Sequence, residues 1–147
     1  MTKIIASIVL MVLTITSVGQ SPVKWTFTAN KGSGDTCEVH LTATIAAPWH
    51  IYSQFTPAGG PLPTSIGLNK NPLFVKIGAA KEIGQLVSRY EPVFNVDIKY
   101  YAAKVDFVQL LKLKGKARTR LSGVIQYMAC TDKECLAPEK VSFAVDL

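Results

Sequence analysis

Apolar and polar residues alternate along much of this chain, a pattern typical of β-strands with one buried face. Residues 23–29, 37–45 and 141–147 show the alternation most clearly. In the second of these runs Cys37 shares one face with Val39 and Leu41. We therefore expect a buried, inert thiol at Cys37 and an exposed His40 on the opposite face.

Further strands are predicted at residues 65–68, 74–77 and 119–127, whereas residues 57–63 are too rich in proline and glycine for regular structure. Residues 79–87 are the best candidate for a helix. Basic side chains recur at every second position and predict a hairpin that turns at Gly115 with a solvated face; they are Lys112, Lys114, Lys116, Arg118 and Arg120. Many short strands with few helices predict an all-β fold, an immunoglobulin-like antiparallel β-sandwich.

The N-terminus has the features of an export signal. Lys3 is followed by an apolar stretch over residues 4–15, and small residues end the segment at Gly19. This pattern predicts a signal peptide at residues 1–19 and one mature domain at residues 20–147. An uncleaved membrane anchor is the alternative, although the stretch is shorter than the roughly 18 residues expected of a spanning helix. Export would place the domain in an oxidising compartment.

Composition narrows the function classes only a little. A formal net charge of +6 favours acidic partners weakly and does not indicate a nucleic-acid partner. Three cysteines are too few for a disulfide-dense scaffold, so the core must come from packing.

The candidate chemistry lies in a pair of cysteines near the C-terminus. Cys130 and Cys135 are separated by four residues, between two runs that are predicted to be strands. Facing strands bring such residues close to disulfide distance. Closing a loop of six residues stabilises a fold by only about 2 kcal/mol, so the pair is as well suited to thiol–disulfide exchange as to stapling a hairpin. A zinc or copper site would need a further ligand from His40 or His50.

The chain also resembles a known family. The exported single domain, the pattern Tyr-x-x-Cys-x-x-x-x-Cys-x-x-Pro that begins at Tyr127, and the segment Trp49-His50-Ile51-Tyr52 are similar to the N-terminal periplasmic domain of DsbD. That resemblance implies an immunoglobulin-like domain of a protein-disulfide reductase. Its cysteine pair takes electrons from a thioredoxin-like domain and passes them to periplasmic thiol oxidoreductases.

Carried over to this sequence, the resemblance assigns the redox pair to Cys130 and Cys135, with Cys135 forming the mixed disulfide. It places Tyr52 beside the pair and makes Phe94, within residues 91–95, the aromatic that covers the sulfurs until a partner docks. It implies a periplasmic or secreted protein with no metal and no small-molecule cofactor, and a membrane electron donor on a separate chain. The competing hypothesis is a secreted binding module whose disulfide is purely structural.

Overall fold

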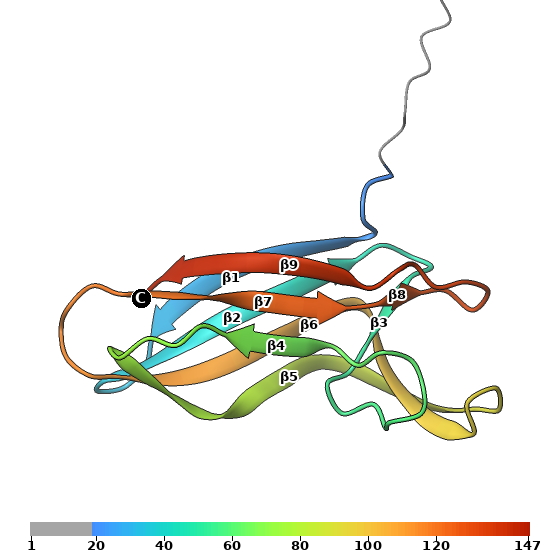
Figure 1. The fold of residues 1–147 in the computed structure, drawn as a ribbon, viewed down its shortest axis with the longest axis horizontal. Coiled ribbons are helices and arrows are strands. Elements are labelled where there is room, and N and C mark those ends of the chain that lie inside the picture. The colour runs from blue at the N-terminus through green and yellow to red at the C-terminus, as the bar shows by residue number, and fades with distance from the viewer. Residues whose placement is uncertain (1–18) are drawn as a thin grey trace, which may run out of the picture.

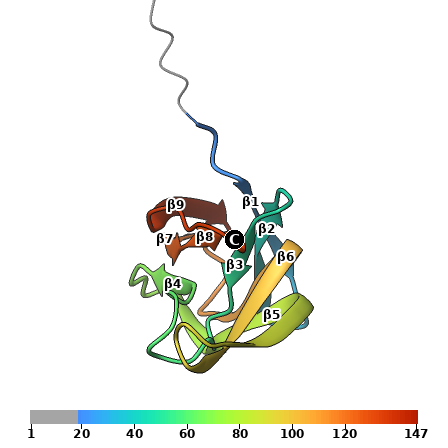
Figure 2. The same cartoon turned by 90° about the vertical axis from the view of Figure 1, so that its right-hand side faces the viewer.

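The computed structural model describes residues 19–147, so nearly all of the predicted signal peptide lies outside the described residues. Nine strands form two antiparallel sheets that face each other (Figures 1 and 2). The strands are β1 (Val23–Lys31), β2 (Thr36–Ile45), β3 (His50–Tyr52), β4 (Ser65–Leu68), β5 (Phe74–Glu91), β6 (Val96–Leu113), β7 (Arg120–Tyr127), β8 (Ala129–Cys130) and β9 (Glu139–Asp146). In this range no helix has the length and hydropathy that a bilayer crossing demands.

The larger sheet is built around β6. Its strand order is β1-β2-β6-β3-β8, and β5 pairs with the other edge of β6. The smaller sheet has the order β4-β7-β9. The predicted all-β sandwich is therefore confirmed.

Side chains from both sheets form the core. Leu41 and Phe107 of the larger sheet pack in one cluster with Leu121, Ile125 and Phe143 of the smaller sheet. The alternation predicted for β1, β2 and β9 is present, because along most of each strand every second residue is buried or half-buried and is less exposed than its neighbours. Alternate side chains point to opposite faces of a strand, so the apolar face is the one that is buried.

Cys37 lies in this core with 1% of its surface exposed, and it is a free thiol. Burial raises the pKa of the thiol, which keeps it in the unreactive form. The predicted burial of Cys37 is confirmed. His40, by contrast, is not the exposed residue that we expected, because its Nδ1 lies 2.7 Å from a carboxylate oxygen of Asp106 and only 22% of its side chain is exposed.

Two local predictions were wrong. Residues 79–87 are not helical but belong to β5, a strand of 18 residues. Its register against β6 shifts between Ile77 and Lys81 and again between Gly84 and Leu86. These irregularities change the phase of the alternation, which gives apolar residues a spacing that resembles that of a helix.

The basic segment does not form a hairpin at Gly115 either. β6 ends at Leu113 and pairs with β2, β3 and β5, whereas β7 begins at Arg120 and pairs with β4 and β9. The intervening residues 114–119 therefore carry the chain from the larger sheet to the smaller one, as the loop at the left of Figure 1 shows. The basic side chains are exposed, as expected for a solvated segment.

Candidate functional site

Cys130 and Cys135 form a disulfide, with their Cα atoms 4.0 Å apart. They close a short loop, residues 130–135, which we call the disulfide loop. Thr131 organises it: its backbone N–H donates to the carbonyl of Glu134 at 2.7 Å, and its hydroxyl accepts from the backbone N–H groups of Lys133 and Glu134. The predicted pairing is confirmed, and the loop conformation is supported by hydrogen bonds that do not involve sulfur.

The disulfide loop lies where the chain leaves one sheet and returns to it. β7 belongs to the smaller sheet, β8 pairs with β3 of the larger sheet, and β9 is again in the smaller sheet. Cys130 ends β8 and is therefore anchored in a sheet, whereas Cys135 stands beyond it in the loop. Cys37 is paired with Leu111 of β6, whereas β3, the strand next to Cys130, is paired with β6 at Ala102. These two positions are nine residues apart along β6, or roughly 30 Å, so Cys37 lies far from the disulfide.

The two sulfur-bearing residues have different environments. Cys130 is 1% exposed and packs in a small cluster with Tyr52 and Ile98. Cys135 is exposed. Only Cys135 is therefore open to attack from solvent, since a buried sulfur is shielded by its neighbours.

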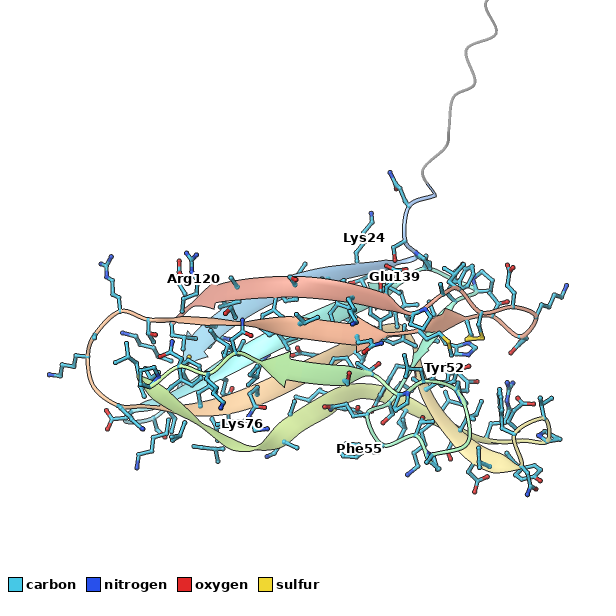
Figure 3. All side chains as sticks on the ribbon, viewed as in Figure 1. Lys24, Tyr52, Phe55, Lys76, Arg120 and Glu139 are labelled. Atoms are coloured by element: carbon cyan, nitrogen blue, oxygen red, sulfur yellow. A yellow bond between two sulfur atoms is a disulfide. The ribbon has the colours of Figure 1, made fainter. Side chains whose placement is uncertain are left out.

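A pocket of ≈ 250 Å³ opens beside the disulfide. We call it the disulfide pocket. It is formed by β3, the disulfide loop and the turn that joins β5 to β6; its lining includes His50, Tyr52, Arg89, Val93, Phe94 and Cys135. Figure 3 shows Tyr52 at the same end of the sandwich as the disulfide.

The structure thus brings together all four residues named from the sequence. Tyr52 is 4% exposed and packs with Cys130, while Phe94 lines the same pocket as Cys135. Phe94 lies in the β5–β6 turn, residues 92–95, where the backbone N–H groups of Phe94 and Asn95 both donate to the carbonyl of Glu91. With 43% of its surface exposed, Phe94 is not a core residue.

Arg89 connects this turn to the disulfide loop. Its guanidinium lies 3.4 Å from a carboxylate oxygen of Glu91 and 3.5 Å from one of Asp132, and it sits over the ring of Tyr100. The side chains of Arg89 and Asp132 are 44% and 77% exposed. Exposed pairs of this kind contribute about 0.2–1 kcal/mol, so the end of β5, which leads into the turn, is held against the disulfide loop by weak interactions.

His50 is a member of the site to which the sequence assigned no role. It lies directly opposite Cys130 in the antiparallel pairing of β3 with β8. It is 6% exposed, its Nε2 lies 3.2 Å from the hydroxyl of Tyr52, and its ring packs on that of Tyr100. Burial lowers the pKa of His50; Asp132 opposes this shift and Arg89 adds to it. The sequence signals were its place in the segment Trp49-His50-Ile51-Tyr52 and its position two residues before Tyr52, which puts both on one strand face.

Buried hydrogen bonds fix the segment that follows β3. The carboxylate of Glu82 accepts from the hydroxyl of Ser53 at 2.7 Å, from the backbone N–H of Gln54 at 2.7 Å and from the hydroxyl of Tyr101 at 2.8 Å. Burial and this carboxylate together raise the pKa of Tyr101. Because Glu82 is on β5 and Tyr101 on β6, the network ties the end of β3 to the hairpin that carries Phe94.

Residues 19–147 contain no group of three or more histidine, cysteine or acidic side chains placed to hold a metal ion. In this state the two sulfurs are also bonded to each other, and a thiolate ligand must be free.

Two solved structures have a similar fold. The N-terminal periplasmic domain of ScsB from Proteus mirabilis matches 87% of this chain with a TM-score of 0.56 and 17% sequence identity. The N-terminal domain of Neisseria meningitidis DsbD in its reduced form matches 82% of this chain and 83% of its own, with a TM-score of 0.51 and 16% identity. This chain spans about half of the ScsB structure, 47%.

No protein-family model and no curated protein sequence matches the chain. At 16–17% identity the structural likeness establishes the fold, an immunoglobulin-like β-sandwich of the kind found in these N-terminal domains.

Proposed function

We propose that this protein is a thiol–disulfide exchange domain in which Cys130 and Cys135 relay reducing equivalents from a thioredoxin-like donor to oxidised client proteins. The observation that carries the proposal is the asymmetry of the pair: Cys135 is exposed in a pocket, and Cys130 is buried behind it. A structural staple has no need of one accessible sulfur. An exchange site does, because one sulfur must meet the partner while the other waits to resolve the complex.

The chemistry follows from this asymmetry. In the reduced protein the thiolate of Cys135 attacks the client disulfide, forming a mixed disulfide and releasing one client thiolate. Cys130 then attacks Cys135, which releases the second client sulfur and forms the intramolecular disulfide. The client gains two electrons and the cysteine pair loses two; a thioredoxin-like donor reverses the sequence and restores the thiols.

The surroundings of the pair support selective exchange. Phe94 and Val93 are exposed apolar residues that line the disulfide pocket, and the end of β5 that leads into their turn is joined to the disulfide loop by the weak pair of Arg89 with Asp132. A docking partner can displace such a turn at low cost, since each pair contributes about 1 kcal/mol or less. Phe94 is then the cover that limits unproductive reaction of Cys135, and Tyr52 is the aromatic support behind Cys130.

A periplasmic location completes the proposal. It is supported by the ScsB domain, which is periplasmic, and by the apolar segment that predicts a cleaved signal peptide at residues 1–19. In an oxidising compartment the pair stays reduced only if a donor supplies electrons, which is why a thioredoxin-like partner belongs to the same function.

The decisive experiment traps the intermediate. Reduced Cys130→Ser is mixed with a thioredoxin that retains only its attacking cysteine, presented as a mixed disulfide with thionitrobenzoate. We expect a covalent complex on a non-reducing gel, because the resolving thiol is missing. Cys135→Ser should form far less, since its remaining sulfur at position 130 is buried. The double variant, with Cys37 intact, is the matched control and should form none.

A second measurement separates exchange from stapling. An exchange pair equilibrates with a glutathione redox buffer, whereas structural disulfides stay oxidised below about −300 mV. If the pair resists the buffer and neither single variant captures thioredoxin, the protein is a stapled β-sandwich binding module and the proposal fails.

A further inference from the structure

His50 occupies the position nearest to Cys130 on the neighbouring strand. The two are directly paired between β3 and β8, so their side chains project from the same face of the sheet. Cβ atoms of such pairs lie about 4.5–5.5 Å apart. His50 also lines the disulfide pocket together with Cys135.

The imidazole is oriented by aromatic neighbours. Its Nε2 is within hydrogen-bond distance of the Tyr52 hydroxyl, 3.2 Å, and its ring centre lies 4.4 Å from that of Tyr100. No hydrogen bond within residues 19–147 involves Nδ1, so this nitrogen is available for a further partner. A buried imidazole held in this way keeps one ring nitrogen for proton transfer.

Cys130 is the residue that needs such a group. Its side chain is 1% exposed and packed against Tyr52 and Ile98, an environment that disfavours a thiolate. Water reaches Cys135 directly, but it has little access to Cys130. A proton that leaves Cys130 therefore requires an acceptor inside the protein.

The electrostatic surroundings keep His50 uncharged near neutral pH. The titratable and charged groups that face it are Tyr52 on its own strand, Cys130 on β8, Tyr100 on β6, Arg89 and Glu91 on β5, and Asp132, Lys133, Glu134 and Cys135 in the disulfide loop. Burial is the largest influence and lowers the pKa of His50; Asp132 acts in the opposite direction and Arg89 in the same one. A neutral imidazole can accept a proton.

We propose that His50 is the proton-transfer group of Cys130 during exchange. The inference rests on the proposed function, because it assigns one step of the same reaction. In the mixed disulfide, His50 takes the proton of the Cys130 thiol and the resulting thiolate attacks the sulfur of Cys135. The Cys130–Cys135 bond forms as the bond from Cys135 to the client breaks. The client sulfur leaves with the bonding electron pair and takes up a proton from the imidazolium or from water.

The same group serves the reverse direction. When the donor thiolate attacks Cys135, the sulfur of Cys130 leaves with the electron pair of the broken disulfide. His50, after taking up the proton of the donor thiol or one from water, passes it to this buried thiolate. His50 thus spares the apolar cluster an isolated negative charge in both directions.

The test uses the reduced protein and one equivalent of the aromatic disulfide dithiodipyridine, followed by stopped-flow absorbance. The first thiopyridone is released when Cys135 attacks the probe, and the second when Cys130 resolves the mixed disulfide. The second phase therefore reports Cys130 alone. In the wild-type protein we expect the second phase to slow as the pH falls through the pKa of His50, because the imidazolium cannot accept a proton.

His50→Gln keeps a hydrogen-bonding partner for Tyr52, and His50→Phe keeps a ring against Tyr100. Both should slow the second phase by about a hundredfold, the lower end of general acid–base effects, and both should lose the inflection of His50. Their first phase should be unchanged, which shows that the pocket is intact. His40→Gln, which removes the only other histidine, is the matched control and should retain both phases.

A second phase with wild-type rate and pH profile in His50→Gln would overturn the proposal. If both His50 variants fail to fold, the His40→Gln variant provides the test. His50 is then the only histidine of the protein, so NMR gives its pKa directly and this pKa can be compared with the pH profile of the second phase. A second phase whose pH profile misses that pKa refutes the role. Failure of the proposed function is distinguishable: the protein would still resolve the probe in two phases but would capture no thioredoxin.

Discussion

Reduction of the Cys130–Cys135 disulfide should leave the protein folded. The bond closes a loop of only six residues, with a sequence separation of 5. On the chain-entropy treatment, opening such a loop lowers the free energy of unfolding by about 2 kcal/mol. Small domains have total stabilities of about 5–15 kcal/mol, so most of the fold's stability should remain.

The structure indicates what holds the loop when the bond is broken. The backbone hydrogen bond from Thr131 to Glu134 and the hydroxyl contacts of Thr131 are independent of the sulfurs. The strands on either side remain joined by the pairing of β7 with β9, which extends to Tyr127 and Glu139. Cys130 keeps its place in the apolar cluster as a thiol, and burial of the side chain is retained.

Two measurements give the same quantity by different routes. Urea denaturation of the oxidised and reduced protein gives the difference in unfolding free energy. Equilibration with glutathione, in native conditions and in urea, gives the ratio of disulfide stabilities in the folded and unfolded chain. A difference of about 2 kcal/mol corresponds to a ratio of about 30.

The double variant Cys130→Ala/Cys135→Ala controls for other effects of the reductant, and its urea midpoint should not change when reductant is added. A loss of about 4 kcal/mol or more on reduction, or unfolding near physiological temperature, would refute the reasoning. The disulfide would then act as a staple, and its hydrogen-bonded loop would not stand alone.

Three further perturbations test the site. Phe94→Ala should speed reduction of the disulfide by dithiothreitol several-fold, because it uncovers the pocket of Cys135. Phe55→Ala, at a phenylalanine that is 57% exposed, is the control and should leave the rate unchanged; equal rates in both variants would contradict the covering role of Phe94. Asp132→Asn removes the ion pair with Arg89 and should raise the same rate by about fivefold at most, with the difference disappearing at high salt; a difference that persists there would exclude an electrostatic origin. Glu82→Ala leaves three donors without their acceptor and should lower the free energy of unfolding by about 2–4 kcal/mol in urea, and a loss below about 1 kcal/mol would show that water replaces the carboxylate.

Features that depend on local pattern could be predicted from the amino-acid sequence. Period-2 alternation identified β1, β2 and β9, because a strand with one buried face must place its apolar residues at every second position. Runs of strand-favouring residues between turn residues identified β4 and β7. The alternation rule also predicted that Cys37 is buried in the core, and the short separation of Cys130 and Cys135 was enough to predict their pairing. Such inferences need only neighbours along the chain.

Which distant segments meet at the disulfide depends on how the strands of the two sheets are paired and packed. His50 became the neighbour of Cys130 because β3 is inserted between β6 and β8, a register that no local pattern encodes. Phe94 lies in the disulfide pocket because β5 and β6 form one long hairpin. The register shifts in this hairpin give β5 a helix-like spacing of apolar residues, which led to the wrong prediction of a helix. Register between strands that are far apart in sequence is set by packing of the whole sandwich, so it is visible only once the fold is known.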